Sequence, residues 1–557
     1  MKKMVRAGVI IGCIVFVSHA SFFTSSYLWL DHGDIENGRA VVSPVDAYRV
    51  FLMRYGMTGY YRPMFTLFHG VNSLLFGAWI PGYHIMLVFL HAVVSVLSIV
   101  LYKKWFGIKD TPLLLIAGSV VAVHPAAWFT VGMLTSAQEV LMMVFLLMLF
   151  ISYHEVRDGK SRWTIVAVFS ALCALFSKET ALVLIPGGIV VYELTRSRKN
   201  YVSAAKTIWL WIAGIIVSYG ILRWIAVPEV WRPLLVDMPV SEYIGTRLSI
   251  IIRAIYAISS LTPVTISDAT RIVPVTGIGI GGAVFICVIS GYIVWKVGMR
   301  HRLVRSFGLF ALFLLPVLNI LPLPRLWSPN YMYSVVVGFS GVVCVVLSMI
   351  QRFSPKIARL ALIMMVVLVV VMGRNTFAAG SRLVSDYELF VPEVSRDPLF
   401  REGHFYLGSW YAKEGNDHLA ETHFSQALRK EEHVISFVDE GAVRINLAGV
   451  VTKRKRYTEA EQLLTEVYNA HDPVYVVISL HNLAYLYDTS ENYEASVALL
   501  SADQETVRQR PLLTVYIKHL LLLKRFDDVE QVLGDQRVLS AQEVMSIQSL
   551  IDAGRKT

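Results

Sequence analysis

The first 373 residues of the chain alternate between long apolar runs and short polar segments. Most runs approach the roughly 17 to 25 residues that an α-helix needs to cross the hydrocarbon core of a membrane. We therefore predict a bundle of about eleven membrane-spanning helices. The predicted spans are residues 6–23, 83–102, 112–130, 137–153, 163–177, 180–194, 207–226, 273–295, 306–322, 331–350 and 357–372.

Basic residues gather in alternate loops between these runs. One set of loops is short and rich in Lys and Arg, as in 103–109 and 300–305, whereas the other set is longer and carries fewer basic residues. Lysine and arginine are enriched on the cytoplasmic side of membrane proteins. The pattern predicts a cytoplasmic N-terminus and, after an odd number of spans, an extracytoplasmic C-terminal part.

The first apolar run has two interpretations. Met1–Ala20 has a basic start, an apolar stretch and a small residue at its end, which is also the pattern of a cleaved signal peptide. Phe22, Phe23 and Tyr27 prolong the apolar character, and this favours a retained helix. In both cases the acidic residues that follow lie on the outer side of the membrane.

Two long outer segments interrupt the spans. Residues 24–82 contain the aromatic stretch Gly59–Gly77, and residues 227–272 contain the apolar stretch Ile244–Leu261, which carries Arg247 and Arg253. Arginine in the middle of a bilayer is costly, so neither stretch is a good span. We expect interfacial amphipathic helices there, with simple packing on the bundle as the alternative.

Beyond residue 373 the composition becomes that of a soluble protein, and a repeat begins. The segments 403–428, 444–468, 480–500 and 515–533 align with one another, and small residues recur in two columns at a period of about 34 residues. This period is typical of tetratricopeptide (TPR) repeats, which stack into a solenoid with a peptide-sized groove. An unrelated helical bundle is the alternative. The columns are Gly408, Ala448 and Ala484, and Ala420, Ala460, Ala495 and Val529.

Composition and charge narrow the function. Hydrophobic residues make up 55% of the chain and charged residues 17%, and the net charge is +10. In a membrane protein such an excess fits cytoplasmic loops and anionic lipid headgroups, so we predict no nucleic-acid partner. The four cysteines lie in apolar runs without CxxC spacing, which argues against a disulfide framework or a zinc site. HExxH, P-loop and GxGxxG motifs are absent from the sequence.

Polar residues collect at the predicted outer ends of the helices rather than in mid-span. Transporters usually carry ionisable residues in mid-span, so the pattern favours a site at the outer membrane face. Such a site suits a substrate that is half lipid and half polar. The polar groups are Asp31–Glu36, Tyr60–Arg62, His124–Pro125, Gln138–Glu139, Ser177–Glu179 and Arg325–Tyr331.

The most acidic of these groups lies in Leu28–Ala40, which holds Asp31, His32, Asp34 and Glu36. Carboxylates at a membrane surface are costly to desolvate, so they usually face water, a partner cation or a reaction. A solvated loop is the alternative. Asp31, His32 and Asp34 could hold a divalent ion, but no metal site is predicted.

The order of the motifs resembles a known family, the transmembrane-and-TPR (TMTC-type) O-mannosyltransferases and their bacterial relatives, which have the GT-C glycosyltransferase fold. The resemblance covers nearly the whole chain, because the TPR-like repeats follow the motifs in the same order. The motifs are the acidic first outer loop, YYRPMFTLFHGVNSLLFG, PGYHIMLVFLHAVVSVLSIVLY, AVHPAAWFTVGMLTSAQEVL, ALFSKETALVLIPGGIVVYEL and LLPVLNILPLPRLWSPNYMYSVVVGF.

The resemblance implies a polyprenyl-phosphate sugar as donor and a protein hydroxyl as acceptor. Asp31 falls where the family has its first acidic pair and would be the general base, with Asp34 as the second carboxylate because His32 follows Asp31 directly. A cation would stabilise the departing phosphate. The implied phosphate-binding residues are Arg62, Lys178 and Arg325, and the implied supporting residues are His32, Tyr61, Glu139 and Glu179. Interhelical salt bridging is the alternative role of Arg62, Lys178, Glu139 and Glu179.

Two departures from the family pattern bear on this interpretation. TSAQE stands where an arginine would precede the acid after the HP motif, and Pro329–Tyr333 replaces Glu-Arg-Tyr-Leu-Tyr. Two family cations are thus absent, which leaves a non-catalytic member as an alternative.

The combined prediction is an all-α protein with three parts: a GT-C-like membrane glycosyltransferase domain over residues 1–373, a linker over 374–402 and an extracytoplasmic TPR domain over 403–557. The TPR groove would bind the protein acceptor or a partner. The alternatives are a non-catalytic TPR scaffold and a lipid-linked glycan polymerase or ligase. We expect an integral protein of a bacterial inner membrane.

Overall fold

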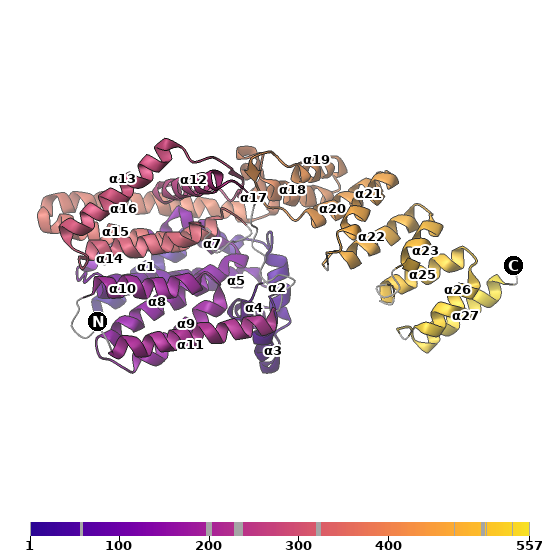
Figure 1. Ribbon diagram of the computed structural model, residues 1–557, viewed down its shortest axis with the longest axis horizontal. Coiled ribbons are helices and arrows are strands. Elements are labelled where there is room, and N and C mark those ends of the chain that lie inside the picture. The colour runs from indigo at the N-terminus through magenta and orange to yellow at the C-terminus, as the bar shows by residue number, and fades with distance from the viewer. Residues whose placement is uncertain are drawn as a thin grey trace. The chain divides into compact units, whose positions relative to one another are not determined.

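The computed structural model describes residues 2–55, 60–196, 203–227, 238–318, 325–472, 474–502, 507, 510–536 and 538–555. Within these ranges the chain is almost entirely helical, with only two strands of two residues each, so the predicted all-α class is confirmed. The chain forms two compact units (Figure 1). The first unit holds residues 1–400 and 431–437, and the second holds 401–430 and 438–557.

Long apolar helices dominate the first unit. Seven helical segments of the described chain are long and apolar enough to cross a membrane, and α9 and α10 are shorter apolar helices. Each predicted span overlaps a helix, so the polytopic membrane unit is confirmed. The helices are α1 (Lys2–Ser18), α5 (Ile80–Trp105), α6 (Thr111–Val123), α7 (Trp128–Gly132), α8 (Ala137–Arg157), α9 (Trp163–Ser177), α10 (Ala181–Thr195), α11 (Ser203–Ala226), α13 (Gly277–Val297), α14 (Arg302–Leu314), α15 (Met332–Phe353) and α16 (Pro355–Ala379).

Local sequence explains where these helices begin and how closely they pack. Asp110 caps α6 by accepting a hydrogen bond from the backbone N–H of Leu113, and Ser354 caps α16 in the same way through Ile357. Gly188 allows α10 to approach α8, because a Cβ atom there would lie 2.1 Å from the ring of Phe150. The first helix packs against α5, α6 and α16 as a member of the bundle.

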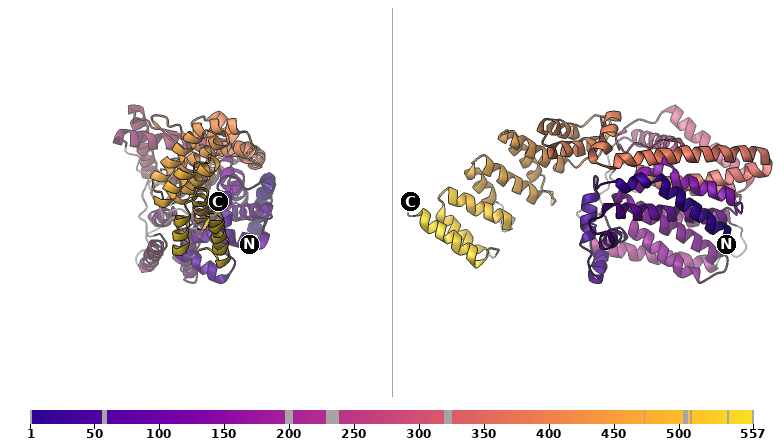
Figure 2. Two further views of the ribbon diagram at one scale, coloured as in Figure 1. Left: turned by 90° about the vertical axis from the view of Figure 1, so that its right-hand side faces the viewer. Right: turned by 180° about the vertical axis from the view of Figure 1, so that it is seen from behind.

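Three short helices gather at one end of the bundle, opposite the start of α1 (Figure 1; Figure 2, right). They are α2 (Asp31–Arg39), α3 (Pro44–Arg49) and α4 (Pro63–Phe76), and we refer to this end as the site end. The acidic segment is therefore helical rather than a loop. Gly38 lets α2 lie directly on α4, because a Cβ atom there would come within 2.4 Å of the Cβ of His69.

The second interrupting segment forms the amphipathic helix α12 (Val240–Ser259), close to the predicted stretch Ile244–Leu261. Ile250, Ala254 and Ala257 are buried, whereas Ile252 and Tyr256 are 68% and 75% exposed. One face of α12 therefore packs on the protein while an apolar face stays uncovered. Such a helix fits the predicted interfacial position, which stays a prediction.

Residues 374–402, predicted as a linker, are mostly helical and belong to the first unit up to residue 400. The last turns of α16 are followed by α17 (Asp386–Arg396), in which Phe390 and Glu393 are fully buried. Glu393 accepts hydrogen bonds from the backbone N–H of Ile266 at 3.0 Å and from Arg382 at 2.6 Å. The segment packs because its apolar and acidic residues alternate at helical spacing.

Residues 431–437 also belong to the first unit, although their neighbours in sequence belong to the second. Strand β1 (Thr270–Arg271) pairs antiparallel with strand β2 (Val434–Ile435), with Thr270 opposite Ile435. The part of the chain that the structure describes also contains short 3-10 helices at Ala20–Thr24, Val50–Leu52, Pro125–Ala127, Leu134–Ser136, Leu315–Leu318, Pro329–Tyr331 and Gly380–Leu383.

The second unit is a succession of helix pairs. Gly408 and Ala420 meet at the contact of the first pair, where a Cβ atom on Gly408 would lie 2.7 Å from the ring of Phe424. Ala448, Ala460 and Ala484 are likewise buried, as the repeat alignment requires. The assignment of these pairs as TPR repeats stays a prediction. The helices are α18 (Arg401–Lys413), α19 (Asp417–Leu428), α20 (Glu440–Lys453), α21 (Tyr457–Asn469), α22 (Val476–Thr489), α23 (Tyr493–Ala502), α25 (Arg510–Leu522), α26 (Phe526–Asp535) and α27 (Ala541–Gly554).

Candidate active site

Asp31, the predicted general base, is the first residue of α2 and is fully buried. One oxygen, Oδ1, accepts a hydrogen bond of 2.8 Å from the backbone N–H of Thr135, which lies just before α8. The other, Oδ2, lies 3.4 Å from the backbone nitrogen of Leu28. Both oxygens of the carboxylate thus face backbone N–H groups, and the side chain lies at the N-terminus of α2. The side chains of His32 and Asp34 lie outside the described residues.

Trp29 links Asp31 to the rest of the site. Its backbone has a φ of +54°, which is uncommon for a bulky residue, and its N–H donates a 2.9 Å hydrogen bond to Asp386. The indole ring packs against Phe129 and Phe390, with ring centroids 5.3 and 5.5 Å apart. These contacts from α7 and α17, two segments distant in sequence, fix an otherwise unfavourable backbone conformation.

Arg62 forms a buried, bidentate ion pair with Glu179. Its Nε and Nη2 donate to the two carboxylate oxygens of Glu179 at 2.9 Å each, and Nη1 donates to Gln138. Its guanidinium also lies 4.1 Å from the ring centroid of Tyr60. Burial alone would lower the pKa of Arg62, but the carboxylate of Glu179 outweighs burial and the pKa is raised. Arg62 is thus permanently charged and paired.

Lys178 and Glu139 form a second buried pair beside the first. Lys178 follows the last residue of α9, Glu139 lies in the first turn of α8, and their side chains are 5% and 6% exposed. The ammonium group of Lys178 also lies 5.5 Å from the ring centroid of Tyr331. Each pair is electrically neutral. Arg62 and Lys178 therefore each already have a carboxylate as the anionic partner that a phosphate would otherwise be.

Arg325 is arranged differently from the other two predicted cations. Its side chain is 21% exposed, against 9% for Arg62 and 5% for Lys178, and it forms a salt bridge with Asp268, whose Oδ2 is 4.0 Å from Nε. Its guanidinium lies between two aromatic rings, 5.3 Å from the centroid of Trp29 and 5.0 Å from that of Phe437. Arg325 therefore presents an accessible, oriented positive charge next to the residue pair Trp29–Asp31.

Two tyrosines connect Arg325 to the buried ion pairs. The hydroxyl of Tyr331 donates a 3.2 Å hydrogen bond to the backbone carbonyl of Arg325. Burial raises the pKa of Tyr60, and Arg62, Glu179 and Arg325 all lie within electrostatic range of its phenol. The three predicted cations thus belong to one cluster at the site end, together with Glu139 and Glu179.

The predicted supporting residue Tyr61 faces away from this cluster. Its hydroxyl donates to the backbone carbonyl of Phe51 at 2.7 Å, its ring packs on Phe176 and Tyr219, and burial raises its pKa to about 12. Tyr60, its neighbour, is the one that contacts Arg62. Consecutive residues in an extended segment point in opposite directions, so only one of the two can reach the guanidinium.

Sequence reasoning missed several residues of the site. Asn330 accepts hydrogen bonds from Thr130 and Ser136 at 3.2 and 3.0 Å, and it stands in the motif Pro329–Tyr333 where the family has an arginine. Asp268 has no motif around it and offered no signal. Within the described residues, no group of three His, Cys, Asp or Glu side chains is arranged to hold a metal ion.

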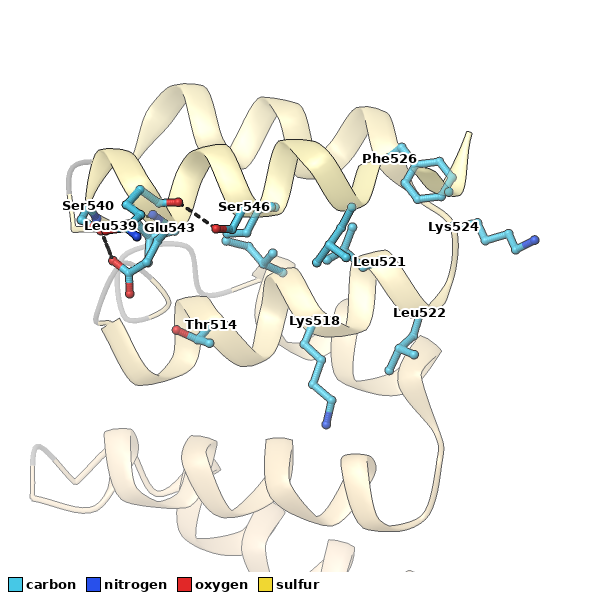
Figure 3. A pocket seen from close by; sticks show the side chains of 15 residues that line it. Thr514, Lys518, Leu521, Leu522, Lys524, Phe526, Leu539, Ser540, Glu543 and Ser546 are labelled. Carbon is cyan, nitrogen blue, oxygen red and sulfur yellow. Dashed lines mark hydrogen bonds between the residues drawn. The ribbon is translucent and has the colours of Figure 1, made fainter. Parts of the chain in front are cut away.

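A separate groove lies in the second unit, between α25 and α27 (Figure 3). It measures about 860 Å³, and its lining is largely apolar, including Leu521, Leu522 and Phe526. Lys518 and Lys524 also line it, and Figure 3 shows their side chains extending away from its apolar centre. The groove is large enough for a few side chains of an extended peptide.

Comparisons with known proteins find relatives for part of the chain. No protein-family model matches it. Protein O-mannosyl-transferase TMTC3 of Homo sapiens is 32% identical over 138 residues, which are 24% of this chain and 15% of the human protein. Protein O-mannosyl-transferase Tmtc1 of Drosophila melanogaster is 27% identical over 183 residues, or 31% of this chain and 21% of the fly protein. The resemblance to the TMTC-type proteins is therefore confirmed, and the chain matches about a fifth or less of the length of these relatives.

Two solved structures show weak similarity along much of the chain. ArnT from Cupriavidus metallidurans bound to undecaprenyl phosphate is 13% identical, with a TM-score of 0.39, and the match covers 88% of this chain and 79% of that one. The oligosaccharyltransferase of Archaeoglobus fulgidus tethered with an acceptor peptide is 11% identical, with a TM-score of 0.40, and covers 78% and 61%.

Proposed function

We propose that the chain is a membrane glycosyltransferase of the GT-C type, which transfers a mannose-like sugar from a polyprenyl phosphate to a protein hydroxyl. The observation that carries the proposal is that a carboxylate and a guanidinium both lie next to Trp29. A buried carboxylate, Asp31, lies two residues from this tryptophan, and the accessible guanidinium of Arg325 lies over its ring. Resemblance to proteins named as O-mannosyltransferases supports the choice of sugar and acceptor.

Asp31 acts as the general base. Its carboxylate takes the proton of the acceptor hydroxyl while the hydroxyl oxygen attacks C1 of the sugar, and the bond between C1 and the phosphate oxygen breaks. The N–H of Thr135 fixes one oxygen of Asp31, and each carboxylate oxygen has a further lone pair for the acceptor. Because the acceptor displaces the phosphate directly, the anomeric centre inverts.

Arg325 binds the leaving group. The electron pair of the broken bond goes to the polyprenyl phosphate, which departs as a stable anion and needs a cation rather than a general acid. Arg62 stays paired with Glu179 and Lys178 with Glu139, and these two ion pairs line one side of the site. We propose Arg325 as the direct phosphate contact because its side chain is more exposed than those of Arg62 and Lys178.

The second unit binds the protein acceptor. The groove between α25 and α27 takes an apolar stretch of a protein, with Lys524 at its edge favouring neighbouring acidic residues. We place the protein in a bacterial inner membrane with the site end and the helix pairs outside the cytoplasm. This orientation rests on the basic loops, which carry Lys103, Arg157 and Arg352 at the opposite helix ends.

The transfer reaction itself tests the proposal. Purified full-length protein in lipid nanodiscs is incubated with polyprenyl-phosphate mannose and a serine- and threonine-containing peptide, and the product is analysed by mass spectrometry and by NMR of the anomeric proton. We expect a peptide hexose with inverted configuration. Transfer only to glycan acceptors would instead establish a polymerase or ligase, and no transfer from any polyprenyl-phosphate sugar would leave a TPR scaffold.

The groove is tested in the same reaction. Leu522 lines the groove and is 50% exposed, so Leu522→Gln should raise KM for a peptide acceptor without affecting the fold. Met545 on α27 is 65% exposed but does not line the groove, and Met545→Gln is the control. Equal KM values for both variants and the wild type would refute acceptor binding in this groove.

A further inference from the structure

An apolar groove lies where three helices of the first unit meet, and none of its lining residues belongs to the candidate active site. Helices α1 and α16 lie side by side, and both pack on α6 (Figure 2, right). The groove measures about 650 Å³, within the range of about 300 to 1,000 Å³ that small-molecule sites occupy. Val17 and Val370 form its rims and are 72% and 65% exposed, whereas Ser18 and Ser119 form its floor and are buried.

The length of the groove matches one leaflet of a membrane. Its lining residues run from Val366 to Phe377 on α16 and from Leu115 to Val123 on α6. At about 1.5 Å of rise per residue these stretches cover roughly 16 and 12 Å, close to half of the ~30 Å hydrocarbon core of a bilayer. A membrane-spanning helix of a partner protein would need a groove along the whole core. The dimensions therefore favour the acyl chain of a lipid from one leaflet.

Hydrogen bonds fix the mouth of the groove at the site end of the bundle. The hydroxyl of Ser21, just after α1, donates to the backbone carbonyl of Phe377 at 2.6 Å. The hydroxyl of Thr376 donates to the carbonyl of Val123, the last residue of α6, at 2.9 Å. The ends of α1, α6 and α16 are thus held to one another, so the shape of the mouth is a property of the fold.

Arg374 places a positive charge at this mouth. Among the described residues that line the groove it is the only charged one, and it is exposed. Its Nη1 lies 3.5 Å from Oδ1 of Asn375, which is neutral, and in the described part of the chain Arg374 forms no ion pair. An arginine in such a place packs its stem on apolar surface and presents its guanidinium to a phosphate. Apolar walls below a guanidinium are the complement of an anionic lipid.

We propose that the groove binds an anionic phospholipid of the leaflet on the side of the site end. One acyl chain lies between α1 and α16 on the floor formed by α6, and the phosphate of the headgroup contacts Arg374. The proposed function places the phosphate of the polyprenyl donor on Arg325, which does not line this groove. The bound phospholipid is therefore a second lipid, and its site is independent of the transfer reaction.

Photo-crosslinking tests the role of the charge. Full-length protein in phosphatidylcholine nanodiscs receives a small fraction of phosphatidylglycerol with a diazirine on one acyl chain, and crosslinked residues are mapped by mass spectrometry. We expect crosslinks to the lining residues of α1, α6 and α16. Arg374→Gln should lower their yield about fivefold, the contribution of one basic residue at a lipid surface, and Arg374→Lys should retain most of it. Arg359→Gln is the control, because Arg359 is exposed on α16 but does not line the groove.

A second pair of variants tests the shape of the groove. Val370→Trp fills the groove from its exposed rim and should abolish these crosslinks. Val367→Trp is the matched control, because Val367 is 56% exposed on the same helix but does not line the groove. Both variants should bind polyprenyl phosphate as the wild type does, because the donor site is elsewhere.

The outcomes distinguish a specific site from bulk lipid and from the donor. Equal crosslinking by the matching phosphatidylcholine probe, unaffected by Arg374→Gln, overturns the inference. So does displacement of the probe by polyprenyl phosphate but not by unlabelled phosphatidylglycerol, which would assign the groove to the donor. Wild-type crosslinking in Val370→Trp, or equal loss in Val367→Trp, also overturns it. None of these results depends on whether the protein transfers sugar.

Discussion

The contribution of the buried ion pair between Arg62 and Glu179 to the stability of the protein can be tested quantitatively. Both side chains are less than a tenth exposed, at 9% and 7%, and three of the four hydrogen bonds from the guanidinium go to Glu179, where they engage both carboxylate oxygens. Glu179→Gln keeps the shape of the side chain but removes its charge, which leaves Arg62 charged and buried. Removal of one partner of such a pair costs about 3 to 5 kcal/mol.

The double variant should behave differently. Arg62→Met combined with Glu179→Leu replaces both charges by apolar groups of similar volume, and such replacements are often neutral or stabilising. We therefore expect the double variant to lie within about 1 kcal/mol of the wild type, well above either single variant. The Gln138 side chain loses its partner in the double variant, which sets the remaining cost at about that of one hydrogen bond.

The measurement is reversible unfolding of the full-length protein in mixed micelles, followed by circular dichroism across a denaturant series. Arg49→Met is the control, because Arg49 is 66% exposed and lies 3.6 Å from Asp46 in a pair that should contribute less than about 1 kcal/mol. Glu179→Gln within about 1 kcal/mol of the wild type would refute the reasoning. A double variant whose cost equals the sum of the costs of Arg62→Met alone and Glu179→Leu alone would also refute it, because additivity means that the charges do not interact.

Two further predictions concern the second unit. Burial lowers the pKa of His423, whose Nδ1 lies 2.9 Å from that of His404, so the folded state binds fewer protons than the unfolded state below the ordinary value of 6.5. The helix pair α18 and α19 should therefore be most stable above pH 6.5 and lose stability below it, which would appear as faster hydrogen exchange at pH 5.5. His423→Gln should remove this pH dependence. His418→Gln should not, because His418 is exposed. Gly408→Ala places a Cβ atom against Phe424 and should destabilise the same pair by about 1 to 3 kcal/mol, whereas Gly449→Ala, with open space around it, should be neutral or stabilising by up to about 1 kcal/mol in thermal unfolding. A destabilised Gly449→Ala or an unaffected Gly408→Ala would contradict the packing described here.

The membrane helices could be predicted from the sequence because each is a continuous apolar run. The approximate positions of α5, α8 and α15 could be predicted from their own apolar runs, without reference to any other part of the chain. The same reasoning failed for 374–402, because α17 is a short helix of mixed composition whose stability comes from packing. Phe390 and Glu393 are buried by partners that lie far away in sequence, and a pattern of 11 residues does not reveal them.

The charged residues of the candidate site could be predicted from the sequence, but the ion pairs that they form could not. Arg62, Lys178, Glu139 and Glu179 stood out as charges at helix ends, yet Arg62 and Glu179 are 117 positions apart and only the fold decides which acid meets which base. Arg325 contacts Asp268 and Phe437, which no motif marked. A strand of two residues such as Val434–Ile435 has no periodicity, so its pairing with Thr270–Arg271 leaves no trace in the sequence.

The rate of sugar transfer by Asp31→Asn tests the central claim most directly. Asparagine keeps the size of the side chain but cannot take the proton of the acceptor, so transfer should fall by about 10²- to 10⁴-fold while binding of polyprenyl phosphate is retained. Asp46→Asn, which alters another carboxylate near the site end, is the control and should transfer at nearly the wild-type rate. Transfer by Asp31→Asn at the wild-type rate would contradict the assignment of Asp31 as the base and move the search for it to Asp34.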